Sequence, residues 1–217
     1  MNRKKMILLT SPLVFIPLIV GLILWNKLPA EIPVHFSVAG VADQFTSKTF
    51  AVLGIPVLLW LLHLLTGFII LADPKKQNIN DKVFTLMLYT VPAVGIFSTV
   101  IMYTSALNMP VSVNMVGGLF VGIVFLFVGN NLPKRKQNYT VGIKLPWTLN
   151  DTENWNKTHR FGGVLWIICG VILLVNAFLD FIILVPVVIA SAILLPTAYS
   201  FLLYIKKNGS NPENNAE

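Results

Sequence analysis

Charged residues are scarce in this chain. They make up 12% of its 217 residues, whereas a soluble domain carries about 25%. The mean hydropathy is +0.75, and so short and apolar a chain has too few polar side chains to cover itself in water. The composition therefore excludes an ordinary soluble domain and predicts a protein that lies in a lipid bilayer.

Cysteine and the motifs of catalysis are nearly absent as well. The single cysteine, Cys169, lies in an apolar run and cannot form an internal disulfide, so no disulfide framework exists. The sequence contains no zinc motif, no Gly-rich phosphate loop with Lys-Ser/Thr, and no nucleophile elbow or triad. We therefore expect no metal, no cofactor and no enzyme activity.

Long apolar runs make up most of what remains. Six runs approach the roughly 20 residues that a helix needs to cross the hydrocarbon core, and none contains Lys, Arg, Asp or Glu. The runs are 6–25, 51–72, 83–107, 110–130, 161–179 and 181–204. Runs this long and uniform suit helices rather than barrel strands. The predicted fold class is an all-α integral membrane protein, a bundle of six transmembrane helices.

Basic residues are distributed unequally around these runs. Of the 16 Lys and Arg residues, 14 fall in the N-terminal segment, the second loop, the fourth loop and the C-terminal segment, which six spans place on one side. Only Lys27 and Lys48 fall on the other side. Because cytoplasmic loops are enriched in Lys and Arg, we expect both termini to be cytoplasmic. The net charge of +7 thus arises from basic clusters beside the apolar runs, where they contact anionic lipid headgroups. We therefore expect no direct contact with nucleic acid.

The connection formed by residues 26–50 is the only long one on the side that carries few charges. Apolar residues alternate from Ile32 to Val38, which predicts a short strand or an extended segment. Two prolines exclude a regular helix there, and Gly40 allows a turn. We predict an outer binding loop, and a structured cap on the bundle is the alternative. The predicted binding residues of the outer loop are Pro33, His35, Phe36, Gly40 and Asp43.

His63 lies within the second apolar run, whereas the spans place His35 and His159 on opposite sides of the membrane. The three histidines therefore cannot share one metal ion. An ionisable side chain at membrane depth is a functional candidate by default. The alternative is a neutral imidazole that forms a hydrogen bond with a neighbouring helix.

Residues 131–160, here called the signature loop, join the fourth and fifth runs. This loop holds six basic residues and two tryptophans, and loops so long and so rich in special residues usually carry function. Gly142 permits a turn, and Pro146 holds the residue before it in an extended conformation. Asn150 or Asp151 is expected to cap a helix that continues into the fifth span. An interfacial anchor with a basic stop signal is the alternative interpretation.

The signature loop also carries a resemblance to a known family. It resembles the pattern G-N-x-L-P-K-x-K-x-N-Y-x-x-G-I-R-T-P-W-T-L, followed by Trp and K-T-H-R, of the SdpI-type immunity family of small bacterial membrane proteins. Lys144 and Leu145 depart from the pattern, where the family usually has Arg and Thr. The outer loop resembles a module of unknown function often found at the N-terminus of such proteins. The residues of this region that we predict to bind a partner are Asn130, Pro133, Lys134, Lys136, Asn138, Tyr139, Gly142, Lys144, Pro146, Trp147, Trp155, Thr158, His159 and Arg160.

The resemblance implies a function, partners and a domain order. The best-known member of the family gives immunity to a secreted, membrane-damaging peptide and holds a cytoplasmic repressor at the membrane. The implied partners are the lipid bilayer of the bacterial plasma membrane, a toxic peptide outside and a repressor inside. The implied order is a two-helix module at 1–72, an SdpI-type four-helix region at 73–207 and a tail at 208–217 that we expect to be disordered.

Two other functions also agree with the sequence. A small transporter or channel would use His63 and the prolines of the spans to line a path, and its flux would depend on His63. An envelope-stress or lipid-interacting protein would tolerate changes at His63 but would fail when the basic cluster is neutralised. The sequence makes no prediction of the oligomeric state.

Overall fold

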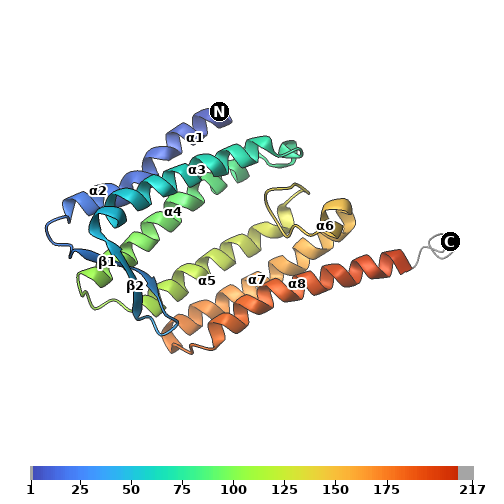
Figure 1. Cartoon of the computed structure of the whole chain (residues 1–217). Coiled ribbons are helices and arrows are strands. Elements are labelled where there is room, and N and C mark those ends of the chain that lie inside the picture. Colours follow the sequence, from blue (N-terminus) through green and yellow to red (C-terminus); the bar gives the residue numbers. More distant parts are fainter. Residues whose placement is uncertain (1, 210–217) are drawn as a thin grey trace. The chain divides into compact units, whose positions relative to one another are not determined.

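Within residues 2–209, six helices are long and apolar enough to cross a membrane (Figure 1). The computed structural model describes residues 2–209, so most of the tail expected to be disordered lies outside the described residues. The six spans are Arg3–Ile23, Phe50–Ala72, Asp81–Ala106, Val113–Lys134, Thr152–Leu179 and Leu184–Gly209. Each overlaps one predicted run, which confirms the prediction of six apolar helices.

Prolines divide the first span, and the second span begins with an irregular turn. The first span consists of α1 (Arg3–Thr10), η1 (Ser11–Phe15) and α2 (Ile16–Ile23). Pro12 and Pro17 stand at the starts of η1 and α2, where a residue without an amide hydrogen is tolerated. The second span consists of η2 (Phe50–Gly54) and α3 (Ile55–Ala72).

The remaining elements follow in chain order, and polar side chains cap two of their helices. Asn80 caps α4 by accepting a hydrogen bond from the amide of Val83 at 2.9 Å, and Asp151 caps α7. This second cap explains why α7 begins well before the predicted run at 161. These elements are η3 (Lys76–Asn78), α4 (Asp81–Ala106), α5 (Val113–Asn131), η4 (Leu132–Lys134), α6 (Pro146–Asn150), α7 (Thr152–Leu179) and α8 (Leu184–Gly209).

The chain packs into two compact units, which are described separately. The first unit holds α1 to α4 and the start of α5, up to Gly117. The second unit holds Asp73–Ile79 and the chain from Gly118 on. The boundary of the two sequence modules, after residue 72, stays a prediction.

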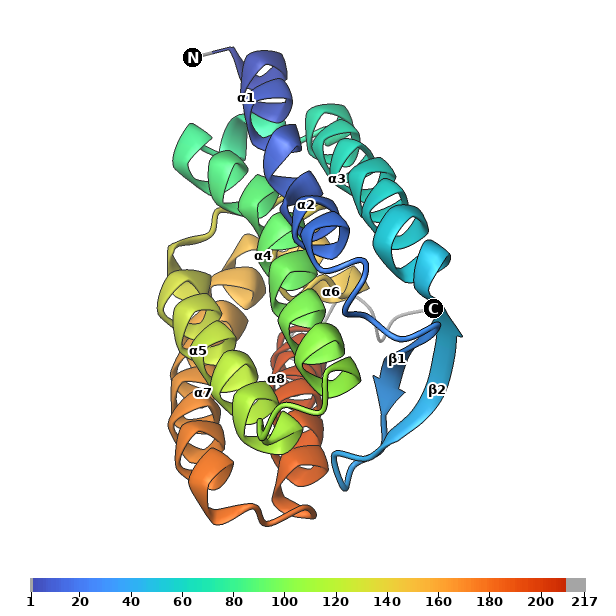
Figure 2. The same ribbon diagram turned by 90° about the vertical axis from the view of Figure 1, so that its left-hand side faces the viewer.

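A β-hairpin completes the first unit. Strand β1 (Glu31–Phe36) pairs antiparallel with β2 (Ala42–Ser47), and Gly40 makes the turn with φ +73°. Figure 2 shows the two strands side by side, and β1 packs against α4. The buried side chain of Ile32 joins a core that includes Met102 and Tyr103. The alternation therefore predicted β1 correctly, whereas the polar sequence of β2 gave no such signal.

In the second unit, α7 and α8 form a helical hairpin, side by side in Figure 1. Asp180 ends α7 with φ +52°, a left-handed conformation that closes the turn. Cys169, Leu173, Val188 and Ala192 form the core between the two helices. The one-residue gap between the predicted runs 161–179 and 181–204 is therefore a tight turn.

Helix α5 approaches α7 closely through glycines. A Cβ added at Gly118 would lie 3.0 Å from the Cβ of Ala177, and one added at Gly129 would lie 2.8 Å from the carbonyl oxygen of Gly163. Small residues let helix backbones approach in this way inside a membrane. The G-x-x-x-G of Gly118 and Gly122 thus faces α7 of the same chain.

Large apolar side chains remain exposed on the outside of the spans. Ile23 is 74% exposed, Phe68 65% and Leu194 63%. Exposed apolar surface on this scale is unfavourable in water and marks a surface that contacts lipid or a partner.

Candidate functional site: the signature loop

The ring of His159 lies at the centre of the folded signature loop. Its Nε2 accepts a hydrogen bond from the amide of Ile143 at 3.0 Å, so Nδ1 carries the proton and donates to the carbonyl of Trp155 at 2.7 Å. The rings of His159 and Trp155 stack with their centroids 3.9 Å apart, and both side chains are fully buried. The indole of Trp155 donates to the carbonyl of Arg135 at 2.8 Å.

Gly142 covers this stacked pair. Its φ is +132°, and a Cβ added there would collide with His159 Nε2 and would come within 2.8 Å of the Trp155 ring. Only glycine combines this backbone conformation with this close approach. The turn predicted at Gly142 is confirmed, and the structure adds that Gly142 packs closely against the rings of His159 and Trp155.

Asp73 joins the segment Asp73–Ile79 to the signature loop. Its buried carboxylate accepts hydrogen bonds from the amide of Lys75 at 2.7 Å, the amide of Tyr139 at 3.0 Å and the hydroxyl of Thr140. Asn138, also buried, bonds to backbone groups on both sides of itself in the loop. A buried carboxylate is stable when hydrogen bonds replace its hydration.

Gln137 makes the second connection between these segments. Its side-chain oxygen accepts from Lys75 Nζ at 2.6 Å, and its side-chain nitrogen donates to the carbonyls of Thr148 at 2.8 Å and Leu149 at 2.9 Å. Lys75 also lies over the ring of Tyr139, 5.4 Å from its centroid. The signature loop is therefore held along its length by polar contacts.

A buried polar cluster binds the start of α7 to α8. Asn154 donates to the carbonyl of Ser200 at 2.9 Å and accepts from the hydroxyls of Ser200 at 2.8 Å and Thr158 at 2.9 Å. The indole of Trp147 donates to the Ser200 hydroxyl at 2.7 Å. Asn154 is buried, so its amide depends on these partners for its hydrogen bonds. A shift of α8 along α7 would break them, and the cluster therefore fixes the register of the two helices.

Charged side chains stabilise the first turn of α7. Asp151 accepts from the amides of Glu153 and Asn154, and Lys207 Nζ lies 2.8 Å from its second carboxylate oxygen. The hydrogen bond from Lys207 lowers the pKa of Asp151 below its ordinary value, and the two amides act in the same direction. Glu153 and Lys157, one helical turn apart, form an ion pair at 2.7 Å. Burial lowers the pKa of the nearby Arg135 guanidinium.

The predicted binding residues of this region thus fall into two groups. Those that hold the loop together are buried or half-buried: Asn138, Gly142, Trp147, Trp155, Thr158 and His159. Those whose side chains are exposed are Asn130, Pro133, Lys134, Lys136, Tyr139, Lys144, Pro146 and Arg160. Only the second group is accessible to a partner without local unfolding. Their role in binding stays a prediction.

The outer-loop residues lie on the hairpin. His35 Nδ1 is 2.6 Å from Asp43 Oδ1, across the two strands, and both side chains are exposed. Pro33 is buried opposite Phe45, and Phe36 is half-buried opposite Ala42. The structure therefore brings His35 and Asp43 together and leaves this pair as the accessible part of the predicted site.

His63 is fully buried in the first unit. Its Nε2 lies 3.1 Å from the hydroxyl of Thr10 and 3.5 Å from the carbonyl of Ile7. Its Nδ1 has no hydrogen-bond partner among the described residues. The contact with a neighbouring helix agrees with one of the two predicted alternatives, and the unpartnered nitrogen keeps the other open.

Sequence reasoning missed Asp73, Gln137 and Ser200. Each lies outside the recognised motif or at a variable position within it, and each acts through a contact that only the folded chain brings together. An aspartate directly after an apolar run was the one signal for Asp73 in the sequence. A separate search for metal ligands found, within residues 2–209, no group of three or more His, Cys, Asp or Glu side chains placed to hold a metal ion.

Comparisons with known proteins match this chain in two regions and along its length. Residues 134–200 match the SdpI/YfhL protein family, and residues 13–60 match a domain of unknown function, DUF1648. The chain is 29% identical over 206 residues to the Immunity protein SdpI of Bacillus subtilis (strain 168), a match that covers 91% of this chain and 95% of that protein. No solved structure matches the chain.

Proposed function

Since this chain is a multi-pass bacterial membrane protein with a DUF1648 domain and an SdpI/YfhL family region, we propose that it is an immunity protein against a secreted, membrane-active toxic peptide. The observation that carries this proposal is the extent of the match to the Bacillus subtilis immunity protein, 91% of one chain and 95% of the other. A match of that extent includes the outer hairpin, the spans and the signature loop together.

The proposed arrangement in the membrane follows from the basic residues. With 14 of 16 Lys and Arg residues on one side, both termini and the signature loop are cytoplasmic. The hairpin then faces the exterior, where His35, Asp43 and their neighbours meet the peptide. Residues 1–72 form the module that contacts the peptide outside, and residues 73–207 form the region that transmits the bound state to the cytoplasm.

The proposed inner site is the exposed rim of the signature loop. Lys134, Lys136, Lys144 and Arg160 are exposed and form no ion pair within residues 2–209. Such a rim suits an acidic surface on a cytoplasmic repressor or the anionic lipid headgroups beside it. The buried residues of the loop, His159 and Trp155 above all, keep that rim in one shape.

A survival experiment tests the proposal. A bacterium sensitive to peptides of the sporulation-delaying type is made to express this chain, and survival is measured after exposure to the peptide. We expect protection comparable to that given by the Bacillus subtilis relative, expressed in parallel. Unprotected cells whose membranes contain the protein at the same level would reject immunity against the peptides tested.

Transport is the second candidate, and one observation favours it. Within residues 2–209, His63 Nδ1 is buried at membrane depth and makes no hydrogen bond of good geometry, and such a group costs free energy unless function requires it. A transporter would lose flux in His63→Leu while its membrane level stays the same. Unchanged protection in His63→Leu would favour immunity without a transport step.

A further inference from the structure

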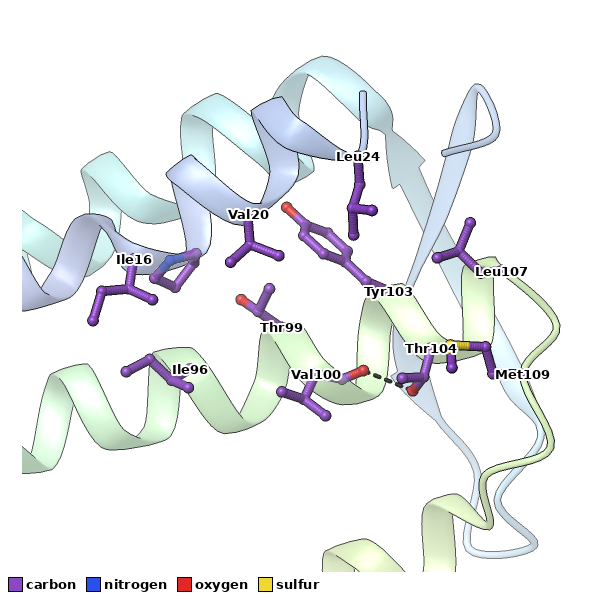
Figure 3. A pocket seen from close by; sticks show the side chains of 11 residues that line it. Ile16, Val20, Leu24, Ile96, Thr99, Val100, Tyr103, Thr104, Leu107 and Met109 are labelled. Atoms are coloured by element: carbon purple, nitrogen blue, oxygen red, sulfur yellow. Dashed lines mark hydrogen bonds between the residues drawn. The ribbon is translucent and has the colours of Figure 1, made fainter. Parts of the chain in front are cut away.

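The groove between α2 and α4 in the first unit is apolar (Figure 3). Side chains such as Val20 on α2 and Ile96 and Val100 on α4 line it. Apolar surface of this kind accepts any hydrocarbon, including the acyl chains of the surrounding bilayer, so the groove identifies no particular ligand. A ligand of definite chemistry is indicated where a charged side chain lacks a partner in the protein.

Arg135, in the signature loop, is such a side chain. It is half-buried, and its guanidinium forms no ion pair and no hydrogen bond within residues 2–209. The other half-buried basic side chains in this part of the chain all bond to the protein. Arg3 forms an ion pair, Lys48 donates to two carbonyl oxygens, and Lys75 donates to a side-chain amide.

A half-buried guanidinium without a partner favours an anionic ligand. Such a group has lost part of its hydration, and hydrogen bonds to an acceptor compensate for that loss. Burial lowers the pKa of Arg135, and no carboxylate within residues 2–209 acts in the opposite direction. Because the side chain is still partly exposed, a ligand can reach it. The planar guanidinium matches the paired oxygens of a phosphate or a carboxylate.

The charge around Arg135 is complementary to an anion. Lys134 and Lys136 on either side of it are exposed and form no ion pair in the described part of the chain. No Asp or Glu occurs in residues 82–150. The Asp73 carboxylate, which contacts the signature loop, is buried and already accepts hydrogen bonds from two amides and a hydroxyl. The segment therefore attracts an anionic partner.

The position of Arg135 favours a phospholipid over a soluble anion or an acidic protein. Arg135 directly follows the span Val113–Lys134, and phospholipid headgroups lie at the ends of spanning helices. Ile123 and Phe127, one turn apart on α5, are 58% and 45% exposed, so this side of the helix offers apolar surface to an acyl chain. A phospholipid carries a phosphate and acyl chains in one molecule and can use both surfaces.

We propose that Arg135 binds the phosphate of an anionic phospholipid, with Lys134 and Lys136 beside it and an acyl chain along α5. The flanking lysines favour an anionic headgroup, because a zwitterionic headgroup carries a positive charge of its own. The Arg135 carbonyl accepts from the Trp155 indole at 2.8 Å, so the lipid site adjoins the buried centre of the signature loop. This site goes beyond immunity, and none of its chemistry rests on that function.

Native mass spectrometry of the full chain tests the site. The purified protein in detergent is titrated with phosphatidylglycerol and, in parallel, with phosphatidylcholine. We expect the first phosphatidylglycerol to bind at lower concentrations than phosphatidylcholine. Arg135→Gln, which removes the charge, should raise the phosphatidylglycerol concentration for half-maximal binding about tenfold. Arg135→Lys, which keeps the charge without the planar pair of donors, should give a smaller increase.

Lys206→Gln is the matched control, because Lys206 is an exposed basic residue near the end of α8 in the same unit. It removes one positive charge from another helix, so this variant should bind phosphatidylglycerol like the wild type. Equal thermal unfolding of all variants shows that they are folded. Equal binding by Arg135→Gln and Lys206→Gln would overturn the proposal, as would equal binding of the two lipids by the wild type.

Two soluble competitors separate the lipid from other anions. Inorganic phosphate at millimolar concentration and a polyglutamate peptide should both leave the bound phosphatidylglycerol in place. Displacement by phosphate would show that the site prefers a soluble anion, and displacement by the peptide would show that it prefers an acidic protein surface. Either result would overturn the lipid site.

The lipid site and immunity fail in different ways, because lipid binding is measured on the purified chain without any toxic peptide. Unprotected cells together with a tenfold effect of Arg135→Gln would keep the lipid site and reject immunity against the peptides tested. Protected cells together with equal lipid binding by Arg135→Gln and the control would overturn the lipid site and leave immunity standing.

Discussion

His159 uses both ring nitrogens inside the protein. Because Nε2 accepts from the amide of Ile143 and Nδ1 donates to the carbonyl of Trp155, the ring is a neutral tautomer with no free polar atom. Its place in a family motif therefore has a structural explanation: it holds a backbone turn against an aromatic ring. A partner would contact the surface that His159 supports.

His159→Ala should destabilise the protein. The substitution leaves the amide of Ile143 without an acceptor and uncovers the Trp155 ring, so we expect a loss of about 2–4 kcal/mol in the free energy of unfolding. Thermal unfolding in detergent, followed by tryptophan fluorescence, measures this loss. Arg160→Ala is the control, since the exposed neighbour should change stability by less than about 0.5 kcal/mol. Equal effects of the two substitutions would contradict the buried role.

Asp151 makes stability depend on pH. Its folded pKa lies below the ordinary value of 3.8 because of Lys207 and two amides, so the unfolded chain binds more protons between these two pKa values. The contribution of Asp151 is therefore fully present above 3.8 and is lost as the pH falls through the folded pKa. Asp151→Asn should reduce the acid-induced fall in melting temperature, and an unchanged acid profile would contradict this assignment.

At the scale of elements, the contact between α5 and α7 depends on glycine. A Cβ at Gly129 would lie 2.8 Å from the carbonyl oxygen of Gly163 and 2.9 Å from the amide nitrogen of Ile167, both rigid backbone atoms. Gly117, also on α5, has nothing within 4 Å of an added Cβ. The same helix thus contains one glycine that is required and one that is free to change.

Gly129→Ala and Gly117→Ala should therefore differ in their effect on stability. The first forces the helices apart and should cost about 1–3 kcal/mol. The second adds helix propensity without a clash and should leave stability equal or raise it by up to about 1 kcal/mol. Thermal unfolding of the two variants side by side measures both. A Gly129→Ala protein as stable as Gly117→Ala would show that the close approach is absent.

Local rules predicted much of the structure of these elements. The Asp151 cap and the turns at Gly40 and Gly142 depend on neighbouring residues, and all are present. The contacts of Asp73 with Tyr139 and Thr140 join positions more than sixty residues apart. No periodicity or short motif encodes such a contact, so it became visible only in the folded chain.

At the scale of the whole molecule, the number of spans could be predicted because hydropathy alone determines it. The composition of the two units could not, because α4 packs with the N-terminal elements while Asp73–Ile79 packs with the C-terminal ones. The burial of His159 and Trp155 could not be predicted from the sequence either. An amphipathic ring suits both a buried site and a membrane interface.

Orientation is a further prediction at this scale. The distribution of basic residues predicts that the hairpin lies outside and the signature loop inside. Cysteines introduced one at a time as Ser37→Cys and Lys144→Cys, with Cys169→Ser in both, should differ in intact cells. A membrane-impermeant maleimide should label only the first before lysis and both after lysis. Labelling of position 144 in intact cells would reverse the proposed arrangement.

Membrane potential in peptide-treated cells tests the central claim most directly. Cells that express the wild type should keep their potential when the toxic peptide is added, whereas cells with an empty vector should lose it. Gly142→Asp, which forces a charged side chain against His159 and Trp155, should lose protection, and Gln77→Ala at an exposed position of the same unit should keep it. Loss of potential in wild-type cells whose membranes contain the correctly oriented protein would contradict the proposed immunity function.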